Sequence, residues 1–89
     1  MYVKETVIIN ESGLHARPAS EFVKCAGKFK SSILIGRAAD HTLVNAKSMV
    51  MLLTLALSKG TRIKLQAEGP DEKYAVDALI ALIDSGFSE

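Results

Sequence analysis

The sequence has few of the residues that stabilise small secreted domains or bind metals. Among its 89 residues there is one cysteine, Cys25, and there are two histidines, His15 and His41. A single cysteine forms no disulfide within the chain, and no Cys or His cluster has the spacing of a zinc site. We therefore expect no bound metal, no cofactor and a cytoplasmic location.

Long apolar runs and an excess of charge of one sign are also missing. The longest apolar stretch, residues 49–57, is interrupted by Thr54 and is shorter than the roughly 18 residues of a membrane helix. The N-terminal residues do not resemble a signal peptide, and the formal net charge is +1. We therefore expect neither membrane insertion nor direct nucleic-acid binding.

Apolar residues make up 48% of the chain. In some segments they alternate with polar residues, and in others they recur with the spacing of a helix. Alternation and β-branched residues predict strands at residues 2–9, 33–35, 43–44 and 61–67. Helical spacing predicts helices at residues 18–27, from 49 to before 59, and from about 70 to 86, with Ser48 as an N-cap and Pro70 in a first turn.

The order β-α-β-β-α-β-α predicts an α+β fold, with three helices on one face of a four-stranded sheet in a single domain over residues 1–89. This order also fits the ferredoxin-like RNA-binding layout. Aromatic residues make up only 6% of the chain and no strand has an aromatic and basic motif, which argues against RNA binding.

The segment Ser12–Ala19 places a histidine at the entrance of a helix, where backbone N–H groups are unpaired and the helix dipole is positive. Pro18 has no N–H, so the nearest donors are those of Ala16 and Arg17, and Arg17 adds a permanent charge. We expect Ser12, Ala16 and Arg17 to bind a phosphate attached to His15. The residues alone leave open that His15 caps the helix or is an ordinary surface residue.

Two motifs carry a resemblance that covers the whole chain: GLHARPA at residues 13–19 and VNAKSMV at residues 44–50. They resemble HPr, the histidine-containing phosphocarrier family of the bacterial phosphoenolpyruvate-dependent sugar phosphotransferase system. The resemblance implies an open-faced β-sandwich with an antiparallel sheet, and a phosphocarrier rather than an enzyme. It also implies that His15 is phosphorylated on Nδ1 with help from Arg17, that enzyme I is the donor and that sugar-specific EIIA domains are the acceptors.

Ser48 falls where this family has a regulatory serine. The resemblance implies phosphorylation by an HPr kinase/phosphorylase, followed by binding to a catabolite-control transcription factor and a role in catabolite repression. The residues alone predict a plain N-cap for the helix that follows. A purely regulatory HPr-like module that acts only through Ser48 is the alternative function.

The resemblance also indicates a docking surface for partners. We expect an exposed apolar patch on the second helix, extended by residues of the first helix, whereas Met51 and Leu52 are expected in the core. The docking residues are Ser20, Lys24, Lys28, Met49, Val50 and Leu53. The loop at residues 36–42 is longer than in typical relatives, and nothing in the resemblance assigns it a role.

Overall fold

The computed structural model describes all of residues 1–89, and its elements follow the predicted order with one addition. They are β1 (Tyr2–Val7), α1 (Ala16–Gly27), β2 (Ser32–Arg37), β3 (Val44–Asn45), α2 (Met49–Thr54), β4 (Arg62–Glu68), α3 (Glu72–Asp84) and the 3₁₀ helix η1 (Gly86–Ser88). The sequence did not predict η1.

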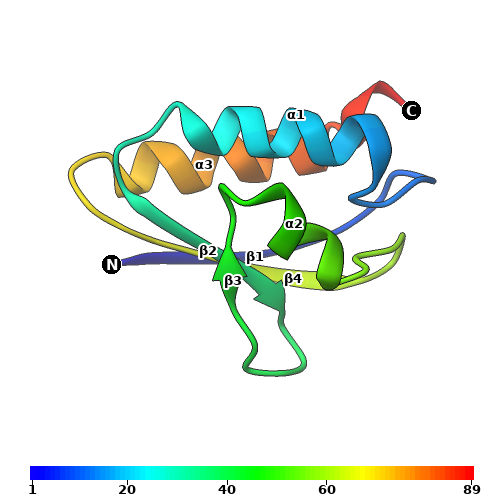
Figure 1. Cartoon of the computed structure of the whole chain (residues 1–89), viewed down its shortest axis with the longest axis horizontal. Coiled ribbons are helices and arrows are strands. Elements are labelled where there is room, and N and C mark those ends of the chain that lie inside the picture. The colour runs from blue at the N-terminus through cyan, green and yellow to red at the C-terminus, as the bar shows by residue number, and fades with distance from the viewer.

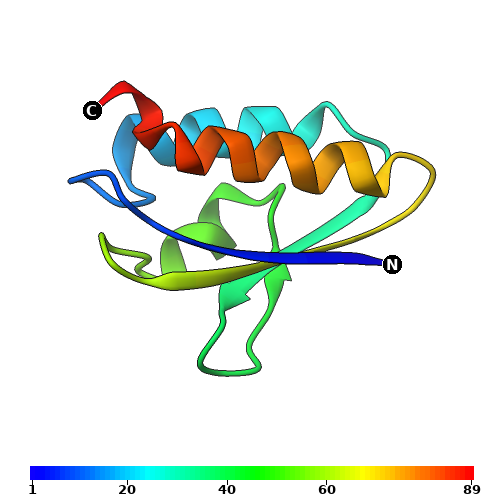
Figure 2. The same ribbon diagram turned by 180° about the vertical axis from the view of Figure 1, so that it is seen from behind.

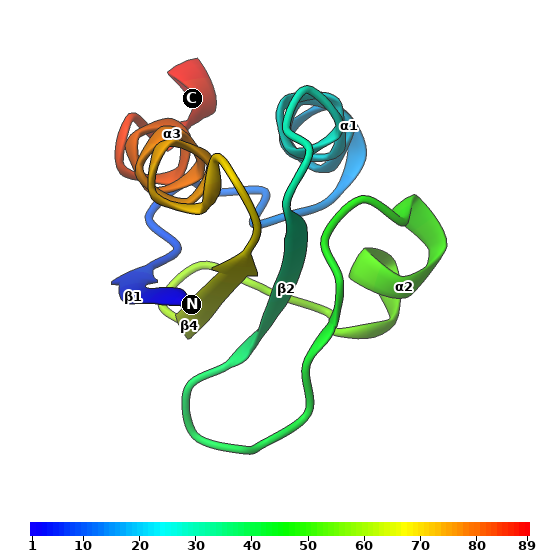
Figure 3. The ribbon, with the colours of Figure 1, turned by 90° about the vertical axis from the view of Figure 1, so that its left-hand side faces the viewer.

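The four strands form one antiparallel sheet in the order β1-β4-β2-β3. Helices α1 and α3 lie side by side over one face of this sheet, and α2 lies beside β3 and α1 on the same side (Figures 1 and 3). No helix covers the other face, as the reverse view shows (Figure 2). The predicted α+β open-faced sandwich is therefore confirmed.

The core lies between the sheet and the helices. Alternate residues of β4, namely Ile63, Leu65 and Ala67, are buried, and they face the buried stripes of α1 and α3. Each fully buried Leu, Ile or Phe side chain contributes about 1.5–3 kcal/mol relative to exposure. This burial fixes the start of α1 against the sheet.

Several predicted boundaries differ from the structure. β1 ends at Val7, although the next residue, Ile8, is still buried and donates its N–H to the Thr61 carbonyl oxygen at 2.9 Å. β2 is longer than predicted, and β3 is one residue later, at Val44–Asn45.

The third helix begins at Glu72, so the prediction that Pro70 occupies its first turn was wrong. Asp71, which lies between Pro70 and Glu72, is hydrogen-bonded to the turn that precedes β2. Its carboxylate accepts hydrogen bonds from the N–H groups of Lys30 and Ser31, both at 2.9 Å, and from the Ser31 hydroxyl at 2.5 Å. These bonds, that of the Ser31 hydroxyl above all, lower the pKa of Asp71 to about 2. The ionised carboxylate therefore fastens the start of α3 to the start of β2.

Candidate functional site

The loop before α1 is held against the segment that follows α2. Gly13 has φ +66°, and a Cβ atom there would lie 2.4 Å from the Leu57 carbonyl oxygen. The next residue, Leu14, is buried and donates its N–H to that same oxygen at 2.8 Å. Only glycine combines this conformation with this close approach, so Gly13 sets the path of the chain into the helix.

His15 occupies the N-cap position of α1 with an extended backbone, at φ −133° and ψ 162°. Its side chain accepts no hydrogen bond from the helix, and neither imidazole nitrogen has a hydrogen-bond partner in the chain. The alternative that the His15 side chain caps the helix is therefore wrong. The half-exposed imidazole leaves both nitrogens available to a reacting group.

The first turn of α1 presents unpaired donors beside His15. The N–H groups of Ala16 and Arg17 donate no hydrogen bond within the chain, and Pro18 has no N–H. Ala16 itself has φ +51°, a left-handed conformation that costs a non-glycine residue about 1–2 kcal/mol. A helix terminus with free N–H groups attracts anions.

The Arg17 side chain turns toward the end of the chain. Its Nη1 donates to Glu21 Oε1 at 2.5 Å, and its Nη2 donates to the Phe87 carbonyl oxygen at 2.7 Å. Nη2 also lies 4.0 Å from Glu89 Oε2. The guanidinium is half-exposed, so it retains donors for a further anion at the same edge of the molecule.

Ser12 already has an anionic partner. Its N–H donates to Glu89 Oε1 at 3.0 Å, and that oxygen also accepts from Asn10 Nδ2 at 3.1 Å. The backbone hydrogen bond from Ser12, with further hydrogen bonds from Ser12 and Asn10 and the charge of Arg17, lowers the pKa of Glu89. An ionised carboxylate thus lies between Ser12 and Arg17.

Four residues of this arrangement were missed by the sequence analysis: Asn10, Glu21, Phe87 and Glu89. The spacing of Arg17 and Glu21, four residues apart on one helix, could have indicated their ion pair. Nothing in the sequence indicated that Phe87, buried with φ +54°, would turn the chain end back over α1.

The predicted cap at Ser48 is confirmed. Its hydroxyl accepts a hydrogen bond from Met51 N at 3.2 Å at the start of α2. The side chain is half-buried, and its backbone is extended at φ −104° and ψ 113°. A substituent on this oxygen would lie at the N-terminus of the helix.

The exposed side of α2 is apolar. Val50 is 72% exposed, Leu53 is 41% exposed, and Met51 is 43% exposed, so the prediction that Met51 lies in the core was wrong. Leu52 is fully buried as predicted, whereas Met49 is half-buried and packs against the core. In a short helix, residues three apart share a face, which places Met49 and Leu52 inward and turns Met51 to solvent.

Helix α1 contacts α2, and the remaining predicted docking residues lie on α1 or directly after it. Lys24 and Lys28 are exposed, and Ser20 is half-buried. The structure thus places the predicted docking residues on two helices that are in contact, except for Lys28, which directly follows the end of α1. No group of three or more His, Cys, Asp or Glu side chains could hold a metal ion, and none of the helices combines the length and the apolar character needed to cross a membrane.

Comparison with known proteins decides the family. The family model described as the HPr component phosphorylation site of the phosphotransferase system (PTS) matches residues 2–85. The chain belongs to the HPr family. It is similar to the phosphocarrier protein HPr of Pseudomonas putida, with 44% identity over 89 residues that cover 100% of this chain and 98% of the relative.

Two further relatives support this assignment. The phosphocarrier protein NPr of Escherichia coli is 42% identical over 90 residues, covering 100% of this chain and 99% of the relative. A crystal structure of HPr from Thermoanaerobacter tengcongensis has a TM-score of 0.95 and 46% identity, covering 100% of this chain and 98% of that one. The chain is accordingly a phosphocarrier of the PTS and not a catalytic enzyme.

Proposed function

We propose that the chain is a single phosphocarrier domain in which His15 accepts a phosphoryl group from phosphorylated enzyme I and passes it to sugar-specific EIIA domains. The observation that carries this assignment is the position of His15. It is the N-cap of α1, its imidazole has no partner, and two unpaired N–H groups follow it.

In the proposed step, the lone pair of a neutral ring nitrogen, Nδ1 of His15, forms the new bond to phosphorus. The bond between phosphorus and the leaving group of enzyme I breaks, and the reverse sequence delivers the group to the acceptor. The N–H groups of Ala16 and Arg17 bind the phosphoryl oxygens, and the Arg17 guanidinium offsets their charge. The positive end of α1 favours the phosphorylated state.

A transfer assay tests this proposal. Purified protein, enzyme I and labelled phosphoenolpyruvate should give one acid-labile phosphate per chain, as a phosphoramidate requires. His15→Ala should abolish labelling with the fold unchanged, because the imidazole makes no hydrogen bond within the chain. His41→Ala, which removes the other histidine from an exposed loop, is the matched control and should label normally. Normal labelling of His15→Ala would refute the assignment.

We propose that partners dock on the surface formed by α1 and α2. The exposed apolar residues Val50, Met51 and Leu53 form its centre. The exposed charge of Lys24 lies on α1, and that of Lys28 directly follows the end of α1. Ser20 and Met49, both half-buried, would border this surface. Val50→Asp should raise the apparent KM for enzyme I, whereas Tyr74→Asp on the exposed side of α3 should leave it unchanged.

We propose a second, regulatory role for Ser48, as the substrate of an HPr kinase/phosphorylase and then as a ligand for a catabolite-control transcription factor. The hydroxyl already faces the first turn of α2, where a phosphate is favourable to the folded state. The same phosphate would lie beside the apolar docking residues and would oppose docking of enzyme I.

Incubation with the kinase and ATP should phosphorylate the wild type and not Ser48→Ala. Ser48→Asp should melt near the wild-type temperature, because aspartate also caps helices, and should show a higher apparent KM for enzyme I. If Ser48→Asp melts far lower yet accepts phosphate on His15 at the normal rate, Ser48 is a structural cap only.

A further inference from the structure

A hollow at the end of the sheet shares no residue with the His15 loop or the docking surface. Its volume is about 360 Å³, and it is lined by Glu5, Arg37, Ala38, Ala39, Thr61 and Arg62. Small-molecule sites in proteins begin at about 300 Å³. One wall belongs to the long loop between β2 and β3, which extends away from α1 and α3 (Figures 1 and 2).

The loop that forms this wall is fixed at several points. Ala38 N donates to the Arg62 carbonyl oxygen at 3.0 Å, and Thr42 N donates to Asp40 Oδ1 at 3.0 Å. The returning chain passes so close to Gly36 that a Cβ atom there would overlap the Thr42 carbonyl oxygen. The hollow is therefore a defined feature of the fold, made by the loop that the family resemblance left without a role.

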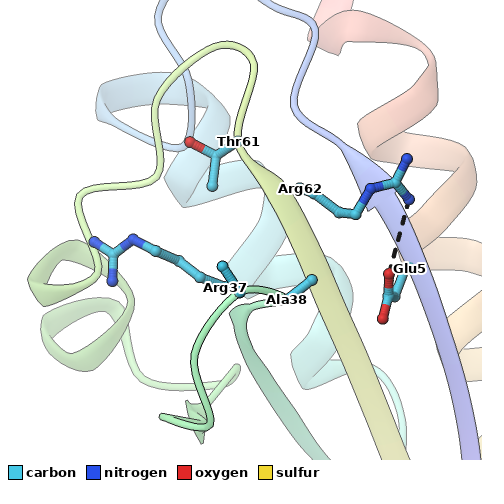
Figure 4. A pocket seen from close by; sticks show the side chains of 6 residues that line it. Glu5, Arg37, Ala38, Thr61 and Arg62 are labelled. Carbon is cyan, nitrogen blue, oxygen red and sulfur yellow. Dashed lines mark ion pairs between the residues drawn. The ribbon is translucent and has the colours of Figure 1, made fainter.

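The chemistry of the hollow is apolar in the middle and cationic at two sides. The side chains of Arg37 and Arg62 extend in opposite directions, with Thr61 and Ala38 between them (Figure 4). The methyl groups of the alanines and of Thr61, with the aliphatic parts of the arginines, form the middle. The lining residues carry two positive charges and one negative charge.

Both guanidiniums have donors to spare. The Arg62 side chain makes no hydrogen bond within the chain, and its Nη1 is 3.8 Å from Glu5 Oε1. The Arg37 guanidinium is oriented by a hydrogen bond that Nη2 donates to the Leu55 carbonyl oxygen. Its Nη1 forms only a loose ion pair with Asp40, at 3.7 Å from Oδ2. Exposed ion pairs at such separations contribute little, so a ligand carboxylate or phosphate can replace these carboxylates. A guanidinium binds either group through two parallel bonds.

From this arrangement the geometry points to a binding site for a small organic dianion with an acidic group at each end and an apolar middle. One end pairs with Arg37, the other with Arg62, and the middle lies on Ala38 and Thr61. A monoanion of the same length reaches only one guanidinium, and a neutral molecule reaches neither, so affinity should fall in that order.

Nuclear magnetic resonance titration of the full chain tests the site with probes matched in length: adipate, hexanoate and hexanediol, with butane bisphosphonate to separate phosphate from carboxylate recognition. Adipate or the bisphosphonate should shift the amide signals of Ala38, Ala39 and Thr61 to saturation. Hexanoate should bind at least tenfold more weakly, and hexanediol should cause no saturable shift. Shifts that do not saturate, that are equal for hexanediol and adipate, or that are confined to Ala16 and Arg17 would overturn the proposal.

A pair of variants sharpens the test. Arg62→Gln removes one guanidinium and should weaken binding about tenfold or more, because a charge-assisted hydrogen bond is lost. Lys64→Gln removes the same charge from the same face of β4 without lining the hollow, and should leave the affinity within a factor of about two. Equal losses in the two variants would show nonspecific attraction to a basic surface and would contradict a site.

Discussion

The side-chain carboxylate of Glu89 accepts a hydrogen bond from Ser12 N at 3.0 Å, and so joins the end of the chain to the loop that precedes His15. The link is doubled by Asn10, whose Nδ2 donates both to this carboxylate and to the Gly13 carbonyl oxygen. The loop before His15 is thus held by two hydrogen-bond acceptors, the Leu57 carbonyl oxygen and the Glu89 carboxylate.

Glu89→Gln should reduce the free energy of unfolding by a small amount that depends on pH. Because the pKa of Glu89 is lowered in the folded state, its stabilisation is present above the unfolded pKa of about 4.3 and is lost as pH falls through the folded value. Urea unfolding at about pH 7 should therefore separate the variant from the wild type, and the gap should close in acid. Glu68→Gln, at an exposed carboxylate without a hydrogen bond or ion pair, is the control; an equal pH-dependent gap there would refute a specific role for Glu89.

Gly13→Ala should destabilise the fold by more than about 2 kcal/mol. The left-handed backbone alone costs alanine about 1–2 kcal/mol, and the added methyl group would overlap the Leu57 carbonyl oxygen that Leu14 N binds. Chemical denaturation measures the loss, and signals from His15 should shift with it. Gly27→Ala, at the end of α1 with open space around it, should be neutral or stabilising by up to about 1 kcal/mol. Similar effects at both glycines would contradict the account of the loop.

Ser48→Ala should lower the free energy of unfolding by about 0.5–2 kcal/mol, the usual effect of losing an N-cap. The physical reason is the lost hydrogen bond to Met51 N, at the start of a helix of only six residues. Ser58→Ala offers the matched control, because Ser58 is exposed and its hydroxyl makes no hydrogen bond in the chain. An unchanged midpoint for Ser48→Ala in urea would show that α2 is held by its buried side alone.

Arg17→Ala should slow phosphoryl transfer roughly ten- to a hundredfold, because a charge-assisted hydrogen bond contributes about 1.5–3 kcal/mol. Transfer should persist, since the N–H groups at the start of α1 remain. Rapid-quench kinetics with enzyme I and with an EIIA domain would measure both half-reactions, and Lys73→Ala, at an exposed position of α3 outside the docking surface, controls for overall charge. Unchanged rates for Arg17→Ala would show that the helix terminus is sufficient.

Periodicity predicted the elements and their order well, because the apolar residues of β4 and α3 follow one period without interruption. It failed where tertiary contacts decide. Met51 belongs to an uninterrupted apolar run, Met49 to Leu53. Only the way in which the six-residue helix α2 packs against the core turns the Met51 side chain to solvent.

The candidate site was predictable in part, for a related reason. A histidine before a helix, followed by Arg17 and Pro18, indicates an anion site from local chemistry alone. The contribution of Asn10, Phe87 and Glu89 depends on contacts between residues that are 70 or more positions apart in the sequence, such as the hydrogen bond from Arg17 to Phe87. No local pattern indicates such a contact.

The most direct test of the phosphocarrier mechanism is nitrogen-15 nuclear magnetic resonance of the protein after incubation with enzyme I and phosphoenolpyruvate. The account predicts that the Nδ1 resonance of His15 acquires coupling to phosphorus, and that the amide signals of Ala16 and Arg17 move as their N–H groups bind the phosphate. Phosphate on another residue, or a phosphorylated His15 with both amide signals unmoved, would contradict it.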